Sequence, residues 1–145
     1  MSSYVSAELR RHVRRRAEGL CEYCMIHEDD TGFGCEIDHI SEKHGGQTVE
    51  DNLALACWIC NNSKGTDIAS IDPRTRGIVR LFNPRTDRWS EHFRVEGSEI
   101  LSLTPIGEVT ARILGFNLSD QIDERALLIG KGRFPSPAAL HRIRA

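Results

Sequence analysis

Two Cys-x-x-Cys pairs, Cys21–Cys24 and Cys57–Cys60, are the strongest chemical signal in the sequence. A two-residue gap lets both thiolates of a pair turn towards one point, and two pairs supply four soft ligands in the tetrahedron that Zn²⁺ prefers. A thioredoxin-like redox motif would instead need a single pair in a βαβ setting, which the sequence does not provide. We therefore predict a zinc site, and it should be structural because four thiolates leave no open coordination position.

Residues suited to phosphodiester hydrolysis lie between the two pairs and just after the second. His39 could act as a general base, because histidine titrates near neutral pH and can accept a proton from water. Asp38 and Asn61 offer a carboxylate and an amide carbonyl, the hard oxygen ligands that suit Mg²⁺. A divalent cation held there would neutralise charge that builds up on the phosphate and on the leaving oxygen.

These residues need elements that bring them together, and the sequence predicts a short strand and a helix. Residues 35–40 alternate apolar and polar side chains, which favours a strand. Neighbouring strand residues point to opposite faces, so Asp38 and His39 can share a pocket only near a strand end. The second half of the segment reads as a turn at Gly45-Gly46, an apolar run over 52–56, and a turn that opens a helix over 57–64.

A basic helix is predicted before the first cysteine, over residues 7–18, with Ser6 as N-cap and Gly19 at its end. Its apolar stripe consists of Leu9, Val13 and Ala17, and its other faces carry five arginines, among them Arg11 and Arg15. Such a cluster can form a footprint for phosphates, and Arg11 and Arg15 are our candidate contacts. The alternative is an ordinary solvated helix face.

Composition changes after Lys64-Gly65, where shorter elements are expected. We predict three strands and two helices, over 78–82, 89–95, 99–103, 105–115 and 119–129, and a loosely ordered tail from Gly130. The aromatic residues Phe82, Trp89 and Phe93 should build a small core. The arginines of this half could face a nucleic-acid backbone or serve only as surface charge; they are Arg80, Arg85, Arg88 and Arg94.

The overall composition excludes few partners. The chain has 145 residues and a net charge of −2, so its total charge gives no argument for a polyanionic partner. No apolar run approaches the ~20 residues that cross a bilayer, and residues 1–7 lack the apolar stretch of a signal peptide, so we expect a cytoplasmic protein without a membrane partner. The fifth cysteine, Cys35, is expected to be a buried apolar residue.

Taken in order, these motifs resemble the HNH endonuclease family, with its ββα-metal finger. The resemblance covers about residues 5–66 and combines the arginine helix with five short motifs. They are Cys21-Glu-Tyr-Cys24, Ile37-Asp-His-Ile40, Gly45-Gly46, Asp51-Asn-Leu-Ala-Leu-Ala-Cys57 and Cys60-Asn-Asn-Ser-Lys-Gly65. Each is weak alone, whereas their order and spacing are specific.

The resemblance implies a role for each matching residue. His39 would be the general base, Asp38 and Asn61 would bind the catalytic cation, and Asn52 would orient the His39 loop or ring by hydrogen bonding. Family members often have histidine where this chain has Asn61, and an amide oxygen favours Mg²⁺ or Mn²⁺ over softer ions. The substrate implied is DNA, in duplex form, bound mainly through its backbone.

Two further residues are candidate substrate contacts. His44 could touch the scissile phosphate or supplement the metal site, or be an inert surface residue. Lys64 could contact phosphate, although a lysine at a helix end also simply suits the helix dipole.

The sequence thus predicts an α+β protein, with a zinc-stapled finger over residues 1–66 and a small α+β extension over 67–145. We predict a DNA endonuclease with structural Zn²⁺ and catalytic Mg²⁺ or Mn²⁺. A non-catalytic zinc module that binds nucleic acid would keep the four cysteines without needing Asp38, His39 and Asn61 together. A structural, partner-binding zinc protein is the third reading, and the sequence does not indicate an oligomeric state.

Overall fold

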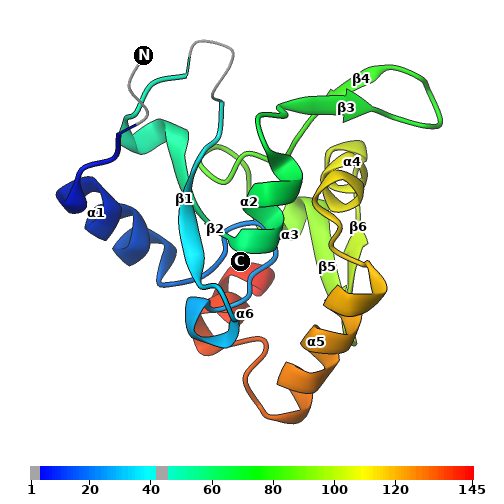
Figure 1. The fold of residues 1–145 in the computed structure, drawn as a ribbon. Coiled ribbons are helices and arrows are strands. Elements are labelled where there is room, and N and C mark those ends of the chain that lie inside the picture. The colour runs from blue at the N-terminus through cyan, green and yellow to red at the C-terminus, as the bar shows by residue number, and fades with distance from the viewer. Residues whose placement is uncertain (1–3, 42–45) are drawn as a thin grey trace.

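The computed structural model describes residues 4–41 and 46–145. Its central feature is an antiparallel strand pair with a helix directly after the second strand, the expected ββα arrangement (Figure 1). A further helix lies against the second strand on the opposite side. These elements are α1 (Ala7–Ala17), η1 (Glu28–Asp30), β1 (Cys35–His39), η2 (Glu50–Asn52), β2 (Leu53–Cys57) and α2 (Trp58–Lys64). The predicted α+β class is confirmed.

The strand pair β1–β2 positions the candidate hydrolytic residues. Cys35 lies opposite Cys57 at one end, and His39 lies opposite Leu53 at the other. All five residues of β2 are buried, because α1 and α2 both pack on this strand. His39 is the last residue of β1, so the expectation that Asp38 and His39 lie near a strand end is confirmed.

The caps that the sequence predicted around α1 and α2 are present. The Ser6 hydroxyl accepts a hydrogen bond from the Leu9 amide at 3.1 Å, which satisfies one of the unpaired N–H groups of the first turn. Val13 and Ala17 are buried on the predicted stripe, and α1 ends in the left-handed conformation at Glu18 and Gly19. α2 ends at Gly65, where φ is +55°.

The C-terminal half contains four strands and four helices among the described residues. They are β3 (Ala69–Ile71), β4 (Ile78–Arg80), α3 (Trp89–His92), β5 (Phe93–Glu96), β6 (Glu99–Ser102), α4 (Pro105–Leu114), α5 (Ser119–Gly130) and α6 (Pro137–Arg144). The strands pair as two hairpins, β3–β4 and β5–β6. The β5–β6 hairpin and helices α4 and α5 correspond to predicted elements, whereas β3 was not predicted.

The prediction of one strand over residues 89–95 is wrong in its first part. Trp89–His92 form a helical turn, which brings the Trp89 and Phe93 rings onto one side with their centroids 5.0 Å apart. The buried Trp89 indole N–H also donates to the Tyr23 carbonyl at 2.8 Å. The four-residue spacing of Trp89 and Phe93 fits a helical turn, and the polar residues between them fit a strand equally well. The hydrogen bond from Trp89 to Tyr23, which is distant in the sequence, decides in favour of the helical turn.

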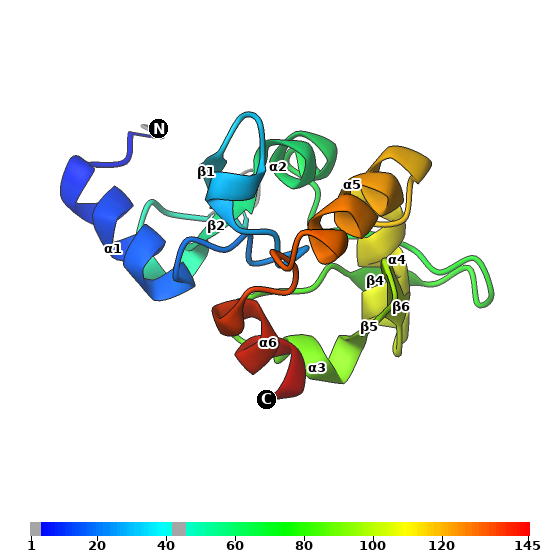
Figure 2. The same cartoon turned by 90° about the horizontal axis from the view of Figure 1, so that it is seen from below.

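The prediction of a loosely ordered tail from Gly130 is also wrong. The Ser136 hydroxyl caps α6 by accepting from the Ala139 amide at 3.2 Å, and Pro137 occupies its first turn. Ala139 and Phe134 are buried, and α6 packs on α3 and β5. Figure 2 shows α6 and α3 side by side below the ββα unit. Burial of this small apolar face gives the segment its order.

The hydrophobic core continues from the N-terminal half into the C-terminal half. The Tyr23 and Phe82 rings pack edge to face, with their centroids 6.5 Å apart. The centroid of the Phe93 ring lies 5.4 Å from the centroids of both Phe82 and Phe116. The division of the chain at residue 66 stays a prediction. Within the described residues, no helix combines the length and apolar character required to cross a membrane.

Candidate metal centre and active-site groove

The four paired cysteines converge on one point. Their sulfur atoms all lie within 4.8 Å of one another, and all four residues are buried. Zn–S bonds of ~2.3 Å in a tetrahedron place the sulfurs about 3.8 Å apart, which matches the 3.8 Å between the sulfurs of Cys24 and Cys57. The donor set and its spacing therefore fit a four-thiolate Zn²⁺.

Local backbone geometry prepares these sulfurs as ligands. The amide of Cys24 points at the Cys21 sulfur at 3.5 Å, and the amide of Cys60 points at the Cys57 sulfur at 3.4 Å. Hydrogen bonds from the neighbouring thiols and from the Cys60 amide lower the pKa of Cys57, which favours the thiolate that binds metal.

Cys35 lies outside this cluster. It is buried opposite Cys57 in the β1–β2 register, and burial raises the pKa of its thiol. The prediction of a buried apolar cysteine that is not a fifth ligand is consistent with this position.

An open groove of about 720 Å³ runs between α1, β1 and α2. Asp38, His39 and Asn61, the three residues expected to share a pocket, all line it. Its wall also contains residues of both signs of charge and a second asparagine, namely Glu36, Arg10, Arg14 and Asn62.

His39 is held at the mouth of this groove by the segment that follows it. Its Nε2 atom lies 3.0 Å from the Thr48 hydroxyl. The Asn52 side chain closes the loop: Oδ1 accepts from the Ser41 amide at 3.0 Å, and Nδ2 donates to the carbonyls of Ser41 and Gln47, both at 2.9 Å. Asn52 thus binds the loop that contains Thr48, whose hydroxyl contacts the His39 ring.

Gly46 is needed where this loop turns back. A Cβ atom built on Gly46 would lie 1.5 Å from the Ser41 carbonyl oxygen, so any side chain would force the backbone apart. The Gly45-Gly46 motif therefore has a steric reason at Gly46. Residues 42–45, including the candidate His44, lie outside the described residues, and the role of His44 stays a prediction.

Asp38 is only 3 % exposed, and both of its carboxylate oxygens accept hydrogen bonds. The Tyr23 hydroxyl donates to Oδ2 at 2.7 Å, and the Lys64 ammonium donates to Oδ1 at 3.3 Å. Burial raises the pKa of the Asp38 carboxyl, and the charge of Lys64 and the bond from Tyr23 partly offset that rise.

Lys64 is buried, and contact with phosphate, one of the two roles that the sequence left open for it, stays a prediction. It is 2 % exposed, and besides Asp38 its ammonium donates to the backbone carbonyls of His39 and Ile40 at 3.2 and 3.1 Å. The three donors of the ammonium group are thereby engaged. These bonds hold the end of β1 against α2.

The Asn61 amide is oriented by a residue that the sequence reasoning missed. Its Nδ2 donates to Glu36 Oε2 at 2.7 Å. Because a carboxylate only accepts, the nitrogen must face Glu36, and Oδ1 is the end that can ligate a cation. Glu36 lies two residues before Asp38, and the period-two rule for strands would have placed it on the same face.

The arginines that line the groove differ from the two singled out by sequence. Arg10 and Arg14 lie in its wall, and Arg14 donates to the Cys35 carbonyl at 3.1 Å and to Glu28 at 3.3 Å. Arg11 and Arg15 are exposed on α1 outside the groove lining, and their contact with phosphate stays a prediction.

Arginines of the C-terminal half are paired with acids. Arg80 forms a two-pronged pair with Asp87, at 2.6 and 3.0 Å, and Arg85 pairs with the buried Glu22. Arg88 and Arg94 pair with Glu91 and Glu96 on the surface. Arg85 in particular is committed to the interior, which removes it from the candidate backbone contacts.

Comparison with known families agrees with this geometry. Residues 21–67 match the family model described as HNH endonuclease. The match begins at Cys21 and ends just after α2, so this segment is similar to an HNH domain and includes the whole ββα unit. Comparisons with curated proteins and with solved structures gave no match.

Proposed function

We propose that the protein is a metal-dependent endonuclease that hydrolyses DNA phosphodiester bonds in the groove between α1, β1 and α2. The observation that supports the proposal most is the lining of one groove by an imidazole, a carboxylate and an oriented amide, those of His39, Asp38 and Asn61. The HNH family match over residues 21–67 supports a nuclease in general.

His39 is the proposed general base. Nε2 of His39 lies 3.0 Å from the Thr48 hydroxyl, and we propose the tautomer in which Nε2 donates to that hydroxyl and Nδ1 is the basic atom. The base takes a proton from the water that attacks phosphorus. Such assistance typically contributes about 10²–10⁴-fold in rate.

Asp38 and Asn61 are the proposed ligands of the catalytic Mg²⁺ or Mn²⁺. Each Asp38 oxygen already accepts one hydrogen bond but has a second lone pair, so the carboxylate can bind a cation while Tyr23 and Lys64 hold it. The bound cation would supply positive charge at the leaving oxygen. Glu36 would keep Asn61 Oδ1 turned towards that ion, the role of an outer residue that orients a ligand.

DNA in duplex form is the proposed substrate. Arg10 and Arg14 bring positive charge to the groove wall, and Arg11 and Arg15 would extend it along the exposed side of α1. Contacts with phosphates carry little sequence information, so cleavage should show low sequence specificity.

Plasmid cleavage tests this proposal. Supercoiled plasmid incubated with the purified protein and Mg²⁺ or Mn²⁺ should be nicked or linearised, and His39→Ala should reduce the rate by at least about 100-fold. His141→Ala is the matched control, because His141 is exposed on α6 and does not line the groove. Equal cleavage by wild type and His39→Ala would refute the assignment. Binding that weakens with salt, without cleavage by wild type, would favour a non-catalytic nucleic-acid-binding module.

A further inference from the structure

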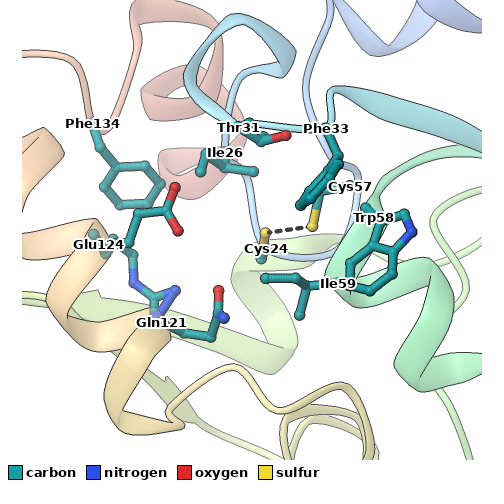
Figure 3. Close-up of a pocket in the computed structure, with 12 residues that line it drawn as sticks. Cys24, Ile26, Thr31, Phe33, Cys57, Trp58, Ile59, Gln121, Glu124 and Phe134 are labelled. Carbon is teal, nitrogen blue, oxygen red and sulfur yellow. Dashed lines mark hydrogen bonds between the residues drawn. The ribbon is translucent and has the colours of Figure 1, made fainter.

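A second cavity lies between the zinc cluster and α5, and its volume is about 150 Å³ (Figure 3). Its floor contains the sulfur-bearing residues Cys24 and Cys57, and its walls are mostly apolar. The proposed hydrolysis does not use it. The other lining residues are Ile26, Thr31, Gly32, Phe33, Trp58, Ile59, Gln121, Glu124, Arg125 and Phe134.

Two exposed aromatic rings form one rim of this cavity. Phe33 is 78 % exposed and Trp58 is 43 % exposed, and their ring centroids lie 5.3 Å apart at an interplanar angle of 37°. The molecule has other exposed apolar residues, but this is a contiguous aromatic surface beside a cavity, and such patches commonly mark binding sites. A stacking surface is therefore available to a flat ligand.

This aromatic rim and the groove have separate lining residues, but neighbouring parts of the same two chain segments contribute to both. Trp58 opens α2, and Asn61 and Asn62 follow three and four residues later, the spacing that places side chains on one helix face. On the other side, Phe33 precedes Cys35 and Glu36, which line the groove. A strand bound in the groove would therefore run within one helical turn of the rim.

Polar groups stand opposite the rings. Gln121 and Glu124 of α5 extend towards the cavity from the side facing Phe33 and Trp58 (Figure 3). A glutamine side chain offers both donor and acceptor atoms, and a glutamate offers acceptors, the groups that recognise base edges. Arg125 also lines the cavity, is buried, and donates to the carbonyls of Ser98 and Phe116.

We propose that this cavity receives an unstacked nucleobase of the DNA strand that lies in the groove, with its face on Phe33 and Trp58 and its edge towards Gln121 and Glu124. The proposal rests on the proposed function, because the groove must hold DNA for the base to reach the cavity. Its consequence is a preference for DNA with an unpaired or weakly paired base near the cleavage site, since extrusion from such DNA costs less.

The test measures binding separately from cleavage, in the His39→Ala background. Two short duplexes are compared, one fully paired and one with a central unpaired 2-aminopurine, whose fluorescence falls when it stacks on an aromatic ring. We expect tighter binding of the unpaired duplex, with quenching of the probe. Trp58→Ala and Phe33→Ala should each weaken binding of that duplex by about 5- to 150-fold and abolish the quenching. Ile78→Ala, an exposed apolar residue on β4, should leave both unchanged.

The outcomes separate this inference from the proposed function. Equal affinity for both duplexes, with plasmid cleavage by wild type intact, would overturn the nucleobase site and leave the nuclease standing. Absence of both binding and cleavage would remove both proposals. If sedimentation showed a dimer that Trp58→Ala dissociates, the aromatic rim would serve self-association and the nucleobase assignment would be wrong.

Discussion

Glu36 shows how one hydrogen bond can decide whether a neighbouring residue is able to bind a cation. An amide presents a donor at one end and an acceptor at the other, and only the oxygen can ligate a metal ion. The 2.7 Å bond to Glu36 selects the useful orientation of Asn61. At the scale of single residues, the proposed centre therefore includes a side chain that need not touch the cation.

Substitution of Glu36 should lower the metal affinity or the cleavage rate more than it lowers the stability of the fold. Glu36→Ala removes the acceptor, and we expect a 10- to 100-fold loss in metal affinity or in cleavage rate, the usual cost of losing a residue that orients a ligand. Glu36→Gln keeps a carbonyl that can accept from Asn61 and should restore part of the loss. Mn²⁺ binding followed by electron paramagnetic resonance, in the His39→Ala background, measures the effect without cleavage. Unchanged Mn²⁺ affinity in Glu36→Ala would contradict this role.

The roles of single residues were predictable only where the spacing of those residues along the sequence indicates the role. The pairing of cysteines and the adjacency of Asp38 and His39 could be read directly. The burial of Lys64 could not be predicted, because it depends on how β1 ends against α2. In the sequence, a lysine at a helix end looks the same whether it faces solvent or a buried carboxylate.

At the scale of elements, the four-cysteine cluster joins the turn that contains Cys21 and Cys24 to the junction of β2 and α2, in a unit built from short elements. β1 and β2 have five residues each and α2 has seven, lengths at which isolated strands and helices are marginal in water. Cys57 ends β2 and caps α2, so one ligand fixes the junction between strand and helix. Loss of the metal should therefore affect the groove as well as the cluster.

Removal of one ligand should release the zinc. We expect about one Zn²⁺ per chain in the wild type and in Cys35→Ala, and little or none in Cys57→Ala, as measured by elemental analysis of purified protein. Binding of Zn²⁺ to such sites contributes on the order of 10 kcal/mol to folding, so a strong chelator should unfold wild type and Cys35→Ala alike, as monitored by circular dichroism. Full zinc content in Cys57→Ala would show that the cluster is not the site.

Elements whose ends are marked by local capping residues were predictable from the sequence. Elements whose conformation depends on distant contacts were not. α4 starts at Pro105 as expected, because the hydroxyl of the preceding Thr104 accepts a hydrogen bond from the Gly107 amide at 3.1 Å, a contact that is local in the sequence. The turn at Trp89 depends on Tyr23, which lies far away in the sequence. Residues 137–144 form α6 because other elements of the fold bury Ala139.

At the scale of the whole molecule, a buried ion pair joins the two halves. Glu22 lies between the first two zinc ligands, is 2 % exposed, and accepts from the Leu55 amide at 3.0 Å and from Arg85. Burial raises the pKa of the Glu22 carboxyl, and the Arg85 charge opposes that rise. No sequence pattern pointed to this pair, because its members lie in different halves of the chain.

Arg85→Met should destabilise the protein strongly because it leaves the Glu22 carboxylate buried without its main partner. We expect a loss of about 3–5 kcal/mol in the free energy of unfolding, measured by urea denaturation at neutral pH with zinc present. Arg88→Met is the control, because the Arg88–Glu91 pair is exposed and such pairs contribute at most about 1 kcal/mol. Similar losses in the two variants would contradict a special role for Glu22 and Arg85.

The contact between α6 and α1 has a consequence for the order of folding. Arg142 donates to the Arg16 carbonyl at 2.8 Å, across 126 positions of the chain. Contacts of such high order form late, because the chain must lose the entropy of a long loop before they stabilise anything. All four cysteines of the candidate zinc site are present once residue 60 has been synthesised. Folding should thus begin at the metal and spread outward, and the last turn of α1 should become rigid only after α6 arrives.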